Sequence, residues 1–137
     1  MRLIVDHVRQ TCGEDGVRRL LEEAGETRPL EVLEDEGVWS SYDAKVRLFE
    51  AAATVTGQPD VGRRVGEGAL ASSVGGSVKL LIGLVGSPAQ VVRGISRAHG
   101  KFSTAAEMSA LTVEPDSAVV RYRVPEPYTP HVHDCGY

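Results

Sequence analysis

The spacing of apolar residues changes once along this chain, from a helical period to a strand period. Leu3, Ile4 and Val8 begin a pattern that recurs every three or four positions and continues, with interruptions, through more than half of the chain. In EMSALTV, residues 107–113, and SAVVRYRV, residues 117–124, apolar and polar residues alternate instead. Helices first and strands last are typical of α+β proteins. We therefore predict a helical N-terminal half followed by a C-terminal antiparallel hairpin or small sheet.

Glycines and capping residues divide the helical part into about six helices. Gly13 interrupts the first apolar stripe. A second stripe follows, and Gly25 ends it at the position that helix ends favour for glycine. The members of the second stripe are Val17, Leu20, Leu21 and Ala24. Ser40 or Ser41 can cap the next strong helix, which Gly57 closes. The pattern thus predicts a helix over roughly residues 41–56.

Two stretches of the helical part have an unusual composition: one is rich in acidic residues and the other contains two glycines within a helix. Residues 26–37 contain Pro29 and a group of acidic side chains, which favours a connector whose charged face is solvated. Asp60 can cap the following helix, and Gly62 and Gly66 lie one turn apart inside it. Because a glycine costs a helix interior about 1 kcal/mol relative to alanine, we expect these two to permit close packing or, alternatively, to leave room for a ligand.

Composition limits the class of protein. The chain has 137 residues, 42% hydrophobic and 25% charged, which suits a single soluble domain over residues 1–137. A net charge of −4 without a basic block argues against nucleic acid as a partner. No apolar run approaches the roughly 18 residues that a membrane helix needs, and the charged start MRLIVDHVRQ is unlike a signal peptide. We expect a cytoplasmic protein in which Cys12 and Cys135 are free thiols.

The sequence contains no recognisable catalytic constellation. A GxSxG elbow is absent, VGGSVK lacks the spacing of a phosphate-binding loop, and the paired carboxylates Glu22–Glu23 and Asp35–Glu36 fall in stretches that look exposed. General acid–base chemistry therefore has no support, and we predict that the protein is not an enzyme.

The closing residues HVHDCGY raise the question of a metal site. On a strand, His131, His133 and Cys135 would lie on one face, and all three residue types bind zinc. A structural zinc site needs four ligands, and the other histidines and the other cysteine are scattered singly. Metal ligation by these three residues and a role as uncoordinated end residues both stay open.

Several stretches together resemble a known family. WSSYDAKVRLFEAA, GRRVGE and LVGSPAQVVRGISRAHGKFSTAAEM, followed by a hairpin and HDCGY, are similar to the N-terminal sensor domain of some bacterial multidomain signalling proteins. That domain resembles the superfamily of vinyl-reductase-type, heme nitric-oxide-binding and Golgi-transport domains. The resemblance implies that HVHDCGY leads into a helix and further strands that this chain lacks. It also implies His99 as the proximal ligand if heme is bound.

The resemblance predicts a non-enzymatic sensor or regulatory module that binds a small apolar ligand and signals to an output domain or partner protein. Alternatives are a heme-based gas sensor with His99 as the iron ligand, and a structural adaptor that acts through dimerisation. An incomplete sheet would favour a homodimer through the hairpin or the helix over residues 41–56. The residues predicted to line the ligand pocket, each of which can equally be a plain core residue, are Val46, Phe49, Val65, Leu81, Leu84, Val92 and Ile95.

Overall fold

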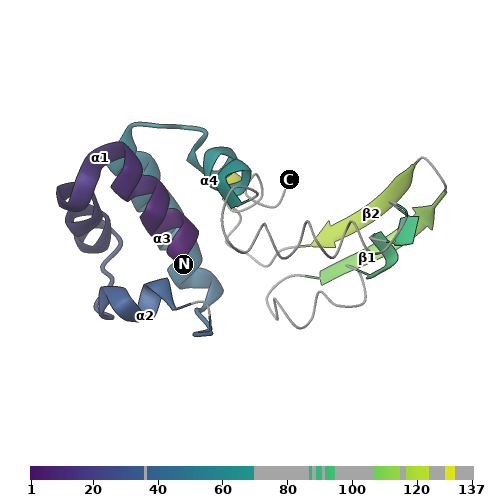
Figure 1. Cartoon of the computed structure of the whole chain (residues 1–137), viewed down its shortest axis with the longest axis horizontal. Coiled ribbons are helices and arrows are strands. Elements are labelled where there is room, and N and C mark those ends of the chain that lie inside the picture. The colour runs from purple at the N-terminus through teal and green to yellow at the C-terminus, as the bar shows by residue number, and fades with distance from the viewer. Residues whose placement is uncertain are drawn as a thin grey trace. The chain divides into compact units, whose positions relative to one another are not determined.

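The computed structural model describes residues 1–35, 37–69, 87, 89–90, 92–94, 107–114, 117–123 and 129–131 (Figure 1). The chain divides into two compact units. The first, called here the helical unit, contains residues 1–71 and 129–137, and the second contains residues 72–128. In the described residues, helices α1 to α4 precede strands β1 and β2, which confirms the predicted α+β class.

Helix α1 (Arg2–Glu23) is bent at Gly13, where the backbone has a φ of +71°. Residues other than glycine rarely adopt this backbone conformation, so the interruption predicted at Gly13 is confirmed. The second half of the helix begins in close contact with the first. A Cβ atom placed on Gly16 would lie 2.3 Å from the Cβ of Cys12, so Gly16 must lack a side chain for this corner to close.

Helix α2 (Leu30–Glu34) lies inside the stretch predicted as a connector, so that prediction is wrong for these five residues. Leu33 is buried, and it anchors the helix although α2 is short. The predicted solvated acidic face is also wrong in part. The Oε1 of Glu34 accepts a hydrogen bond of 2.7 Å from Nη2 of Arg9 on α1.

Helix α3 (Tyr42–Thr56) has the ends that the sequence predicts. The Oγ of Ser41 accepts a hydrogen bond of 3.2 Å from the backbone N–H of Ala44, which makes Ser41 the N-cap. Gly57 ends the helix with a φ of +68°. Helix α4 (Val61–Ala69) follows directly after Asp60, whose Oδ1 is 2.8 Å from Nε of Arg64.

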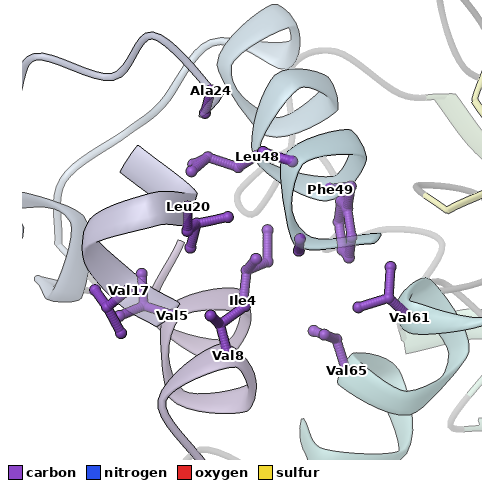
Figure 2. Packing of buried hydrophobic residues seen from close by; sticks show 12 residues of the cluster. Ile4, Val5, Val8, Val17, Leu20, Ala24, Leu48, Phe49, Val61 and Val65 are labelled. Atoms are coloured by element: carbon purple, nitrogen blue, oxygen red, sulfur yellow. The ribbon is translucent and has the colours of Figure 1, made fainter. Parts of the chain in front are cut away.

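The core of the helical unit is formed by the faces that α1, α3 and α4 turn toward one another. Figure 2 shows side chains from these helices converging, with Phe49 of α3 near Val61 and Val65 of α4. Both halves of α1 contribute, and Leu48 and Phe49 have no exposed surface. The cluster contains Ile4, Val5, Val8, Val17, Leu20, Ala24, Leu48, Phe49, Ala51, Ala52, Val61 and Val65.

Strands β1 (Glu107–Val113) and β2 (Ala118–Arg123) form the predicted antiparallel hairpin. The register shifts between Ala110 and Thr112, so that Leu111 is the extra residue of a bulge. The shift breaks the predicted alternation. Val113 is half-buried and Thr112 is exposed, because one additional residue turns the rest of the strand over.

Ser87 followed by Pro88 is a pattern that predicts the start of a helix. Ser87 is a cap, since its Oγ accepts a hydrogen bond of 3.3 Å from the N–H of Gln90. Residues 89–90 and 92–94 are helical, as this pattern predicts. The very apolar stretch SVKLLIGLVG, which predicts a short buried helix, lies outside the described residues. Within the described part of the chain, no helix combines the length and the apolar character needed to cross a membrane.

The packing predicts a large difference between two leucine truncations. Leu48→Ala should lower the free energy of unfolding by about 2–5 kcal/mol, because it opens a cavity in a closed core. Leu111→Ala, at a residue whose exposed fraction is 51%, should change it by no more than about 0.5 kcal/mol. Urea unfolding followed by the helical circular dichroism signal measures both, and equal effects of the two variants would contradict this description of the core.

Candidate functional site: a groove beside helix α1

The helical unit has an open groove of about 320 Å³ along the second half of α1 and the α1–α2 connection. Val17 of its lining is buried and Leu21 and Leu30 are half-buried, so the base of the groove is apolar. The remaining lining residues are charged and form the rim: Glu14, Arg18, Glu22 and Glu26. The lining thus combines three apolar residues with four charged ones, and the volume lies at the small end of the range of small-molecule sites.

Glu26 is the most constrained of the rim carboxylates. Arg28 donates to it from Nε over 2.9 Å, from Nη2 over 2.6 Å and from its backbone N–H over 3.0 Å. These hydrogen bonds, chiefly those from the Arg28 side chain, lower the pKa of Glu26 to about 2. The carboxylate is therefore ionised and fully engaged at neutral pH.

Two arginines connect the rim to the rest of the helical unit. Nη1 of Arg28 donates a hydrogen bond of 3.0 Å to Oγ of Ser40, just before α3. On the other side of the groove, Glu14 accepts a hydrogen bond of 2.6 Å from Nε of Arg9. The bonds that Arg9 makes to Glu34 and Glu14 hold the pKa of this guanidinium above its ordinary value. Two of the three rim carboxylates thus have arginine partners already.

A second polar cluster lies where residues 129–131 meet α3 and α4. The Oγ1 of Thr129 donates a hydrogen bond to Oε1 of Glu50, and Nε2 of His131 is 3.9 Å from the other oxygen of the same carboxylate. The backbone of His131 lies so close to Gly62 of α4 that a Cβ atom there would be 2.1 Å from the His131 carbonyl oxygen. The close packing predicted for Gly62 is thereby confirmed.

None of the described residues that were predicted to line the ligand pocket lines this groove. Phe49 and Val65 belong to the buried core, and Val46 packs against it. Val92 is half-buried in the second unit. The other predicted pocket residues, Leu81, Leu84 and Ile95, lie outside the described residues.

Most residues predicted to bind heme or a metal lie outside the described part of the chain. These are His99, His133 and Cys135. His131 is described, and its one acidic neighbour there is Glu50. Among the described residues, no three His, Cys, Asp or Glu side chains lie close enough together to hold a metal ion. Cys12 is a free thiol, as predicted, and its Sγ lies 3.8 Å from the carbonyl oxygen of Val55.

Sequence reasoning missed both the groove and the Glu50 cluster. Val17 and Leu21, spaced i and i+4, were a visible signal, but the pattern assigned them to the core without indicating that only Val17 is covered. Glu50 and Thr129 are 79 positions apart, and no local pattern connects them.

Comparisons with protein-family models, with curated proteins and with solved structures found no match to this chain. The resemblance to sensor domains therefore stays a prediction.

The Glu26–Arg28 pair predicts a pH dependence of stability. Because folding lowers the pKa of Glu26 from 4.5 to about 2, the stabilisation is fully present above about pH 4.5 and is lost as the pH falls toward 2. In Arg28→Met this contribution should disappear, so the urea midpoint should fall less steeply over that range. Arg18→Met, which removes an exposed pair with Asp15, should retain the wild-type slope. A slope in Arg28→Met as steep as in wild type would show that the pair does not lower the pKa of Glu26.

Proposed function

We propose that the protein is a non-enzymatic regulatory module of the cytoplasm that binds a small apolar ligand and signals its presence to an output domain or partner protein. The observation that carries the proposal is the groove of about 320 Å³ with an apolar base. Burial of apolar ligand surface against Val17, Leu21 and Leu30 would provide the affinity, since removing such surface from water is favourable by roughly 25 cal/mol per Å².

The state of the rim carboxylates supports binding rather than acid–base chemistry. An efficient general base has a pKa near the working pH, whereas the pKa of Glu26 is about 2 and its oxygens are occupied by Arg28. Glu14 is likewise engaged by Arg9. Both carboxylates are therefore poor proton acceptors, and neither is suited to act as a general base.

The position of the groove also supports a regulatory role. Its lining comes from the second half of α1 and from Leu30 at the start of α2, so a bound ligand would contact both helices. Arg28 extends from the rim to Ser40, next to the N-cap of α3. A ligand that stabilises one arrangement of these contacts would change the balance between conformations of the unit, which is what a sensor requires.

The proposal predicts that a polar side chain in the groove weakens binding of an apolar probe. In a fluorescence titration with the neutral dye Nile red, Leu21→Gln should raise the dissociation constant about fivefold or more, because the probe would cover an amide without a hydrogen-bond partner. The same substitution at Leu111, an exposed residue of the hairpin, should leave the dissociation constant unchanged.

Circular dichroism spectra of the two glutamine variants serve as the control for folding. Absence of saturable binding by the wild-type protein, or equal binding by the Leu21→Gln and Leu111→Gln variants, would contradict the proposal.

A further inference from the structure

We propose that residues 129–131, called here the strap, form a releasable closure of the helical unit that docks on α3 and α4 through Glu50 and Gly62. The inference does not depend on a ligand in the groove, whose lining contains none of the residues that hold the strap. It rests on two contacts between residues that are distant in the sequence and on one buried polar atom without a hydrogen-bond partner.

The first contact holds the strap at its N-terminal end. Thr129 is the one buried polar residue in the described part of the chain, with an exposed fraction of 4%. Its hydroxyl donates to the carboxylate of Glu50, which satisfies a group that burial would otherwise leave without a partner. The bond joins residues 79 positions apart, so it can hold the strap on α3.

The second contact is one of shape. Gly62 is the second residue of α4 and is buried. The Cα and carbonyl carbon of His131 would be 2.6 and 2.7 Å from a Cβ atom at this position. Because both are backbone atoms, no rotation of a side chain could relieve the overlap. The absence of a side chain at Gly62 is therefore specific to the docked strap.

The third feature explains why docking is releasable. The side chain of His131 is mostly buried, with 13% exposed, yet its Nδ1 has no hydrogen-bond partner among the described residues. A buried polar atom without a partner regains hydrogen bonds to water when it is exposed, so this atom opposes docking. The Glu50 side chain is 54% exposed, and water also competes for it. The docked strap is thus held by one hydrogen bond and one close fit, and it is opposed by one buried atom.

Two glycine variants of the full-length protein test the proposal. Gly62→Ala should displace the strap, whereas Gly68→Ala, in the same helix but with no atom within 4 Å of the added Cβ, should leave it docked. Native-state hydrogen exchange measured by mass spectrometry should show about tenfold faster exchange in the C-terminal peptide of Gly62→Ala only, with α1 peptides unchanged. Equal exchange in the two variants, or equal acceleration in α1, would overturn the proposal.

A second pair of variants tests the hydrogen bond without changing α4. Thr129→Val keeps the size of the side chain and removes the hydroxyl donor to Glu50. Its matched control is Thr54→Val, at an exposed hydroxyl of α3 that bonds within its own helix. Faster exchange of the C-terminal peptide in Thr129→Val than in Thr54→Val supports the strap, and identical exchange would refute the role assigned to Glu50.

Discussion

The bend of α1 at Gly13 is the constraint on which the rest of the helical unit depends. A straight helix of 22 residues would be about 33 Å long and could not place both of its halves in one compact core. The bend lets Val5 and Val8 of the first half and Val17 and Leu20 of the second join one cluster with α3. It also leaves Leu21, on the second half, at the edge of the core. The groove therefore exists because the part of α1 that continues past the bend is only partly covered.

Arginines determine the arrangement of the segments around this core more than they stabilise it. Arg9 bonds to Asp6 and Glu14 of α1 and to Glu34 of α2, and Arg28 joins the α1–α2 connection to Ser40. The ion pairs of Arg9 are at least partly exposed, so the net contribution of each to stability is small, typically below about 1 kcal/mol. Truncating one buried leucine would cost more. The apolar cluster thus supplies the stability, while the arginines specify how the connection and α2 lie beside α1.

The same division explains what could be predicted from the sequence. The bend at Gly13, the cap at Ser41 and the hairpin are local features, and each was predicted correctly because residues close in the sequence determine it. The bulge at Leu111 and the bond between Arg9 and Glu34 were missed, because the first depends on strand pairing and the second on chain packing.

The candidate site was less predictable than the fold. Apolar residues that cover a core and apolar residues that line a groove follow the same helical spacing, so Val17 and Leu21 look alike in the sequence. The sequence indicated that Gly62 is there for close packing or for a ligand, because glycine destabilises a helix. The backbone atoms that pack against Gly62 belong to His131, 69 positions along the chain, and only the folded structure identifies them.

Binding of an apolar ligand at the base of the groove beside α1 can be located residue by residue in methyl NMR spectra recorded during a Nile red titration. We expect progressive shifts for the methyl groups of Val17, Leu21 and Leu30, with little change at Leu111 and Val119 of the hairpin. Shifts confined to the hairpin methyl groups, or no saturable shift in any methyl group, would contradict this expectation.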